Sequence, residues 1–144
     1  MDFKTLANQY RNELLDNVLP FWLEHSQDLE FGGYFSCLDR EGKVFDTDKF
    51  IWLQGREVWM FSMLYNKVEK RQEWLDCAVQ GGEFLKKYGH DGNYNWYFSL
   101  DRSGRPLVEP YNIFSYTFAT MAFGQLSLAT GNQEYADIAK KTFE

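Results

Sequence analysis

Cysteine, basic residues and long hydrophobic runs are all scarce in this sequence. Its 144 residues include two cysteines, Cys37 and Cys77, which are too few for a disulfide framework and lack the spacing of metal ligands. Lys and Arg number 15 against 21 Asp and Glu, which gives a net charge of -6 at pH 7. We therefore expect both cysteines to be reduced and structural. Because binding to nucleic acid needs clustered Lys and Arg, we also expect no nucleic-acid partner.

The lack of hydrophobic runs excludes two further classes of protein. No segment reaches the length needed to span a bilayer, and polar residues recur throughout residues 1–17, where a signal peptide would need an apolar core. We therefore expect no membrane partner and a cytoplasmic location.

Aromatic residues, by contrast, make up 19% of the sequence. In residues 50–63 the side chains of Trp52, Arg56, Trp59 and Met63 recur at helical spacing, which places them on one stripe of a helix. A guanidinium is costly to bury unpaired. Two interpretations stay open: Arg56 pairs with a structural carboxylate or reaches solvent, or it binds an anionic or polyhydroxyl ligand.

Apolar periodicity and turn residues predict five helices and a hairpin. We expect Pro20 to kink or end the first helix, and Thr47 or Asp48 to cap the helix that contains Arg56. Gly55 within that helix predicts a close helix neighbour or a ligand. The predicted segments are helices at residues 6–22, from the cap to 65, 72–88, 113–130 and from 133 onward, and a hairpin near residues 34–45.

Two stretches of the sequence repeat each other. Tyr-Phe-Ser, Leu-Asp-Arg, a glycine and a basic residue occur in order in residues 34–43 and again in residues 97–105. Each period of about 62 residues then holds two helices and one hairpin, which is typical of an array of helical hairpins. We therefore expect an all-α fold with short β-hairpins at one rim, in which a closed ring of six units would need about 370 residues.

The last predicted helix shows no stop signal. Ala139 and Phe143 are still in register shortly before Glu144, and no Gly, Asn or Pro intervenes. We expect residues 1–144 to be the N-terminal part of a single barrel domain, truncated at residue 144 and comprising roughly its first two hairpin repeats.

Five motifs follow one another between residues 21 and 115, and the resemblance that they carry covers nearly all of the chain from about residue 10. They are Phe-Trp-Leu-Glu-His-Ser-Gln-Asp-Leu-Glu-Phe-Gly-Gly-Tyr-Phe at 21–35, Leu-Asp-Arg-Glu-Gly-Lys-Val-Phe-Asp at 38–46, Lys-Phe-Ile-Trp-Leu-Gln-Gly-Arg-Glu-Val-Trp-Met at 49–60, Gly-Gly-Glu-Phe-Leu at 81–85 and Tyr-Asn-Ile-Phe-Ser at 111–115. Together they resemble the N-acyl-D-glucosamine 2-epimerase family, whose members are also described as renin-binding proteins.

The resemblance implies an (α/α)6 barrel, of which this chain matches about the first third. It also implies interconversion of N-acylglucosamine and N-acylmannosamine: a base removes the C2 proton of the ring-opened sugar, an enediolate-like anion forms, and an acid returns the proton to the other face. The family needs no metal or other cofactor for this chemistry, and ATP is an activator. Its catalytic histidines would lie beyond residue 144, so we expect this fragment alone to be inactive. The resemblance also implies that the whole protein is a homodimer.

The resemblance also assigns roles to residues of the helical stripe. Arg56 matches the arginine of the Trp-Leu-Gln-x-Arg motif, which holds the substrate oxygen that becomes anionic. Trp52 and Trp59 are candidates for stacking on a sugar face, with core packing as the alternative.

A departure from the family pattern occurs at Phe114, where related sugar epimerases and isomerases carry Tyr. Tyr111 or Ser115 is the candidate to supply the missing hydroxyl. His25 is predicted to make a cap or turn hydrogen bond and His90 to lie in a polar Gly-His-Asp-Gly loop, and neither is predicted to act as a base.

Other functions stay open beside the 2-epimerase. One is a related epimerase or isomerase of the mannose or cellobiose type, or a hydrolase, on the same barrel; another is a non-catalytic carbohydrate- or protein-binding member. A glycosidase would need paired carboxylates, for which Asp39, Asp101 and Glu109 are candidates, but the two aspartates are predicted to be turn residues.

Overall fold

Helices dominate the computed structural model, which describes residues 2–144. The helical segments are α1 Phe3–Glu13, the π-helical η1 Leu14–Val18, α2 Leu19–His25, α3 Ile51–Lys67, α4 Gln72–Tyr88, α5 Ile113–Thr130 and α6 Gln133–Phe143. The strands are β1 Cys37–Leu38, β2 Val44–Asp46, β3 Lys49–Phe50, β4 Ser99–Leu100 and β5 Pro106–Val108. None of these helices is both long and apolar enough to cross a membrane.

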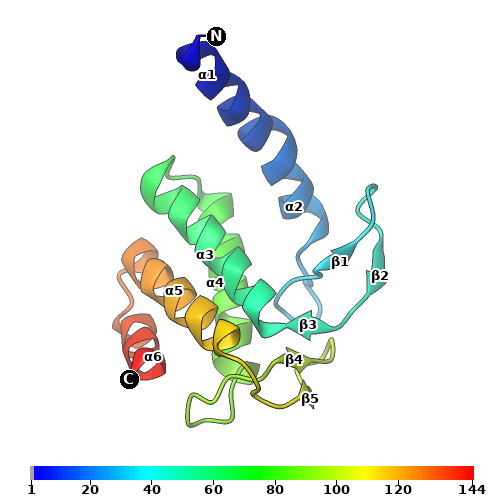
Figure 1. Ribbon diagram of the computed structural model, residues 1–144, viewed down its shortest axis with the longest axis vertical. Coiled ribbons are helices and arrows are strands. Elements are labelled where there is room, and N and C mark those ends of the chain that lie inside the picture. Colours follow the sequence, from blue (N-terminus) through cyan, green and yellow to red (C-terminus); the bar gives the residue numbers. More distant parts are fainter. Residues whose placement is uncertain (1) are drawn as a thin grey trace.

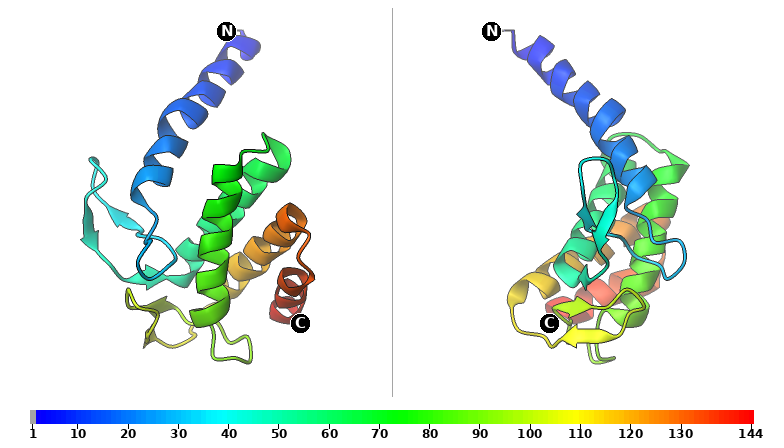
Figure 2. Two further views of the ribbon diagram at one scale, coloured as in Figure 1. Left: turned by 180° about the vertical axis from the view of Figure 1, so that it is seen from behind. Right: turned by 90° about the vertical axis from the view of Figure 1, so that its right-hand side faces the viewer.

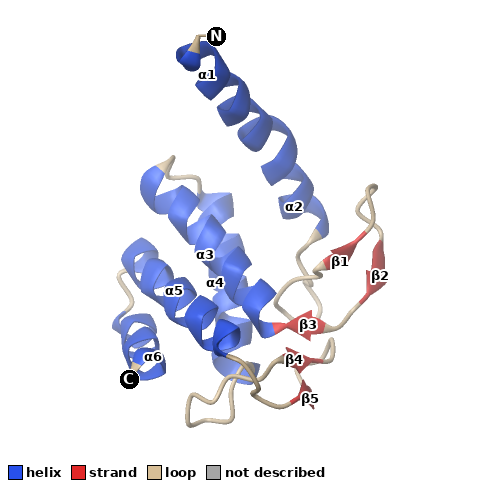
Figure 3. Ribbon diagram, viewed as in Figure 1, coloured by secondary structure: helices blue, strands red, loops and turns tan. Residues whose placement is uncertain are grey.

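The helices pack as hairpins around α3 (Figure 1). Helix α3 contacts both α4 and α5, and α5 contacts α6 in turn. The strands lie together at one end of the helices, near the first turns of α3 and α5 (Figure 3). Strands β1 and β2 form one antiparallel hairpin, while β3, β4 and β5 form a three-stranded antiparallel sheet. The expected helical hairpins with β-hairpins at one rim are confirmed.

The N-terminal helical rod does not end at Pro20. The Leu19 N–H donates to the Leu14 carbonyl across a widened π-helical turn, and Pro20 then lies in the first turn of α2, where its missing N–H costs little. The rod projects away from the other helices (Figure 2). No residue of α1 is buried, and Tyr10 is exposed, so the apolar stripe predicted from the sequence faces outward in this chain.

The start of α3 differs from the prediction. Neither Thr47 nor Asp48 caps the helix; Phe50 is the N-cap residue, and no side chain caps this end. The reason is that the two residues before α3 form strand β3, which pairs with β4. The Ile51 N–H donates to the Phe98 carbonyl at 3.0 Å, so a hydrogen bond to the sheet segment replaces the cap.

A buried ion network ties the rim to the start of α3. Asp28 and Lys49 are both fully buried, and Lys49 Nζ donates to Asp28 Oδ2 at 2.9 Å and to the carbonyls of Gly32 and Arg102 at 2.6 and 2.8 Å. The Arg102 guanidinium donates to both oxygens of Asp28. Burial opposes the ionisation of Asp28, but the hydrogen bonds from Arg102 and Lys49 outweigh it and lower its pKa to about 2. The network therefore joins the two repeats.

The close contact of α3 with α5 explains Gly55 and gives a first prediction. A Cβ at Gly55 would lie 3.0 Å from the backbone of Phe118 in α5, so Gly55→Ala should push the helices apart and destabilise the protein by about 1 to 3 kcal/mol, despite the better helix propensity of Ala. Gly124→Ala is the matched control, because a Cβ there meets nothing within 4 Å; it should stabilise by up to about 1 kcal/mol. Urea unfolding of both variants measures the difference, and equal midpoints would contradict the close approach.

Candidate active site

Arg56 lies exposed on α3, at the mouth of a pocket of about 380 Å³. None of the ion pairs within residues 2–144 includes it. Arg56 therefore pairs with no carboxylate in this part of the chain, and its exposure fits both remaining interpretations, in which it reaches solvent or binds a ligand. The other residues lining this pocket, which we call the Arg56 pocket, are Trp22, Ser36, Leu53, Glu57, Trp59 and Met60.

The Arg56 pocket also holds a carboxyl group. Glu57 is partly buried, and its Oε1 lies 2.5 Å from the hydroxyl of Ser26 at the end of α2. Burial raises the pKa of Glu57 from its usual 4.5 to about 8. A second hydroxyl, that of Ser36, is buried and has no hydrogen-bond partner within residues 2–144. The pocket therefore combines a free cation, a carboxyl and an unsatisfied hydroxyl with apolar walls.

A second recess, of about 270 Å³, lies between α3 and the start of α5. Trp52 and Phe114 both line it, and the Trp52 ring centroid is 6.0 Å from that of Phe118. Asn112 lines the same recess. A recess walled by aromatic rings suits the apolar face of a sugar, so Trp52 and Phe114 are placed together where stacking would occur.

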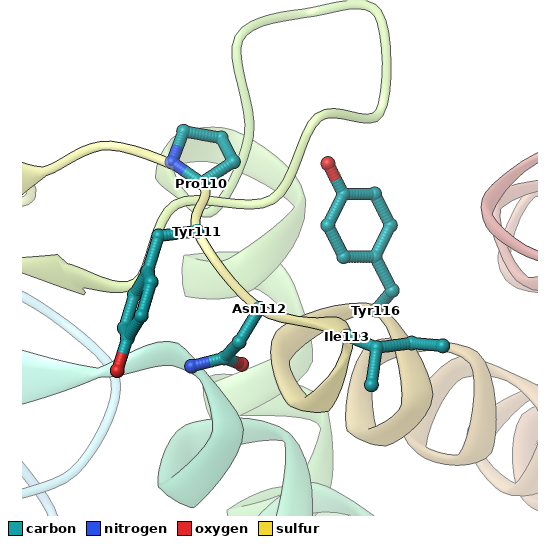
Figure 4. A pocket seen from close by; sticks show the side chains of 5 residues that line it. All are labelled: Pro110, Tyr111, Asn112, Ile113 and Tyr116. Carbon is teal, nitrogen blue, oxygen red and sulfur yellow. The ribbon is translucent and has the colours of Figure 1, made fainter.

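Tyr111 lines a third, shallow pocket of about 450 Å³ beside the recess. Figure 4 shows Tyr111 and Tyr116 pointing away from each other, with Asn112 between them along the chain. Tyr111 is 73% exposed and its ring packs edge-on against Phe98. Ser115, by contrast, is 2% exposed and lines none of the three pockets. Of the two candidates for the missing hydroxyl, only Tyr111 faces outward.

The predicted site residues thus fall into neighbouring groups on two adjacent helices. Arg56 and Trp59 share one pocket, and Trp52 and Phe114 share the next. Glu57 and Asn112 are among the lining residues that the sequence-based prediction missed. Asn112 was detectable, since Asn before an apolar helix start is a capping signal and its side chain does accept from the Phe114 N–H.

The histidines take structural positions. The His90 imidazole accepts a hydrogen bond from the Gly92 N–H at 3.0 Å. His25 makes no hydrogen bond of the kind expected within the described residues; its ring lies 4.9 Å from that of Phe21 and packs against Gly42 in the first β-hairpin. The turn contact expected of His90 is therefore present, whereas the hydrogen bond expected of His25 is not found among the described residues.

The two aspartates among the candidate glycosidase carboxylates are turn residues, as expected. Asp39 accepts from the N–H groups of Glu41 and Lys43, and Asp101 accepts from those of Ser103 and Arg105. Within residues 2–144 no three His, Cys, Asp or Glu side chains are grouped so that they could hold a metal ion. That the chemistry needs no metal stays a prediction.

Comparison with known proteins shows the wider relationship of the chain. The sequence profile of the family N-acylglucosamine 2-epimerase (GlcNAc 2-epimerase) matches residues 33–144. The chain is 48% identical to N-acylglucosamine 2-epimerase of Mus musculus over 125 residues and 47% identical to that of Homo sapiens; each match covers 84% of this chain. The chain spans 30% and 29% of the lengths of these two proteins.

The fold has solved counterparts. The structure of cellobiose 2-epimerase from Bacillus thermoamylovorans B4167 superposes with a TM-score of 0.88 at 32% sequence identity, covering 97% of this chain and 36% of that one. The helical hairpins described above are therefore part of an (α/α)6 barrel. Because the family profile covers residues 33–144, which include the Arg56 helix and the start of α5, the chain belongs to the N-acylglucosamine 2-epimerase family.

Proposed function

We propose that this chain is the N-terminal part of a sugar 2-epimerase that interconverts N-acylglucosamine and N-acylmannosamine. The observation that carries the proposal is Arg56, a guanidinium without an ion pair in residues 2–144, in a pocket with aromatic walls. The 48% identity to an N-acylglucosamine 2-epimerase supports this choice of substrate.

Arg56 has a defined task in this mechanism. Removal of the C2 proton leaves negative charge on a sugar oxygen, and a fixed cation stabilises that charge most where water is scarce. A helix holds the guanidinium in place more firmly than a loop would, so little reorganisation is needed during the reaction. The base and the acid that move the proton belong to the part of the barrel beyond residue 144, which the family supplies with histidines.

The complete protein, meaning the barrel that contains this chain, allows a direct test. N-Acetylglucosamine, N-acetylmannosamine and cellobiose are each incubated with it in deuterium oxide, and deuterium at C2 is followed by NMR. We expect exchange and epimerisation of the two N-acyl sugars and much slower exchange of cellobiose. Exchange of cellobiose alone would instead support the second candidate, a cellobiose-type epimerase, which the 32% identity to such an enzyme favours.

A further expected result concerns residues 1–144 alone. This fragment should incorporate no deuterium into C2 of N-acetylmannosamine, because His25 packs against Phe21 and Gly42 and His90 accepts a hydrogen bond in a turn. The carboxyl in the Arg56 pocket, Glu57, has a pKa raised to about 8 by burial. NMR under the same conditions checks this. Measurable exchange by the fragment would show that the base lies within these residues.

Several finer properties belong to the same proposal. We infer a cytoplasmic homodimer that acts on amino sugars, uses no metal or other cofactor in the chemistry, responds to ATP as an allosteric activator and has no nucleic-acid partner. The net charge of -6 supports the last point. The resemblance to the family supports the others.

A further inference from the structure

A carboxyl group lies next to Arg56 in the chain without pairing with it. Glu57 follows Arg56 in α3 and lines the same pocket, yet Glu57 takes part in none of the ion pairs of residues 2–144. Its only hydrogen-bond contact there is with Ser26. A charged partner would stabilise an ionised, partly buried carboxylate. Because Glu57 has no such partner within these residues, its protonation state has to be determined from its hydrogen bonds.

The number of protons available for the contacts of Ser26 indicates the protonation state of Glu57. Ser26 Oγ lies 2.6 Å from the Trp22 carbonyl oxygen and 2.5 Å from Glu57 Oε1. The carbonyl can only accept, and the hydroxyl has one proton to give. Each of the two contacts has a proton of its own only if Ser26 donates to Trp22 and Glu57 donates to Ser26. This arrangement requires Glu57 to be a neutral carboxylic acid.

The surroundings favour the same state. The pocket walls around Glu57 are mainly apolar, and burial raises its pKa to about 8. The other titratable groups near Glu57 from neighbouring elements are Tyr34 and Cys77, and burial raises the pKa of each well above its usual value, so both stay neutral. Among these groups, only Glu57 changes charge between pH 6 and pH 10.

We propose that Glu57 is a positioning residue, which stays a neutral acid at neutral pH and so leaves the charge of Arg56 free for an oxygen of the bound sugar. Once ionised, Glu57 places a carboxylate in the same pocket, where it competes with the developing oxyanion for the guanidinium. The inference rests on the proposed function for the role of Arg56, but the protonation state of Glu57 stands independently of the substrate.

The pH profile of the complete protein tests the effect on Arg56. The measurement is kcat/KM for N-acetylglucosamine between pH 6.5 and 9.5 in wild type, Glu57→Gln and Glu41→Gln. In wild type kcat/KM should fall about tenfold as pH rises through about 8. In Glu57→Gln this fall should disappear, because the amide cannot ionise yet still donates to Ser26. Glu41 is exposed on a hairpin turn, so Glu41→Gln should keep the fall. An unchanged fall in Glu57→Gln overturns the proposal.

Thermal unfolding over the same range tests the protonation state without any substrate. A carboxyl whose pKa rises from 4.5 to about 8 on folding stabilises the folded state most below pH 4.5, and this contribution is lost as pH rises through about 8. The Tm of wild type relative to Glu57→Gln should therefore fall between pH 6.5 and about pH 8 and level off at higher pH. A difference in Tm that does not depend on pH overturns the proposal. Absence of turnover in wild type would refute the proposed function, while the Tm series would still decide the state of Glu57.

Discussion

Replacing Arg56 with Met in the complete protein should lower kcat by about 10²- to 10³-fold, equivalent to about 3 to 4 kcal/mol of transition-state stabilisation, with little change in Tm. The reason is that Arg56 has no ion pair within residues 2–144 and is exposed, so its loss leaves no buried partner unpaired in this region. Arg56→Lys keeps the charge but loses the planar fork, and should lower kcat by about 10²-fold.

The control for these variants is Arg40→Met, which removes an exposed arginine from the turn of the first β-hairpin, away from the three pockets. It should retain the kcat and the Tm of wild type. Steady-state kinetics and thermal unfolding on the same preparations separate the two interpretations of Arg56. If Arg56→Met lost several degrees of Tm with normal turnover per folded molecule, Arg56 would be a structural residue.

Asp28→Asn is expected to have the largest effect on stability, with a loss of about 3 to 5 kcal/mol. The change leaves Lys49, which is fully buried, without its anionic partner, and Arg102 loses the same carboxylate. Urea unfolding measures the loss. In the double variant Asp28→Asn/Lys49→Met the unpaired buried cation is gone, so the total loss should be smaller than the sum of the single losses. Additive losses would show that the two side chains are not coupled.

The same network predicts a dependence of stability on acid pH. The pKa of Asp28 is lowered to about 2 in the folded state, below the value of about 3.9 for an unfolded Asp. Its contribution is therefore fully present above about pH 4 and is lost as pH falls through about 2. Asp28→Asn should remove this part of the acid sensitivity, and a comparison of Tm between pH 2 and pH 6 checks it.

The helices that local patterns define were predictable from the sequence. The bounds of α4 at Gln72 and Tyr88 and of α5 at Ile113 and Thr130 match the prediction, because apolar periodicity and the following glycines are signals within each segment. The start of α3 was not predictable in this way. Phe50 is its N-cap because β3 pairs with a strand about 50 residues further on, and local sequence does not contain that contact.

The candidate site, too, was predictable only where local sequence patterns determine it. Trp52, Arg56 and Trp59 follow from helical spacing, and the structure places them in two recesses along α3, Trp52 in the one toward α5 and Arg56 and Trp59 in the one toward α2. Which of Tyr111 and Ser115 faces outward depends on how α5 is rotated against α3, and the sequence alone does not determine that rotation. The protonation state of Glu57 depends on Ser26, 31 residues away in the chain, so only the fold could reveal it.

In the proposed mechanism Arg56 holds an oxygen of an open-chain amino sugar. The most direct measurement is a crystal structure of the complete protein with N-acetylmannosaminitol, the reduced open-chain form of N-acetylmannosamine. We expect a nitrogen of the Arg56 guanidinium at about 3 Å from the oxygen on C1 or C2 of this compound, with the chain of the sugar alcohol along the Trp52 and Phe114 recess. A structure in which the compound binds elsewhere while Arg56 pairs with a carboxylate would contradict it.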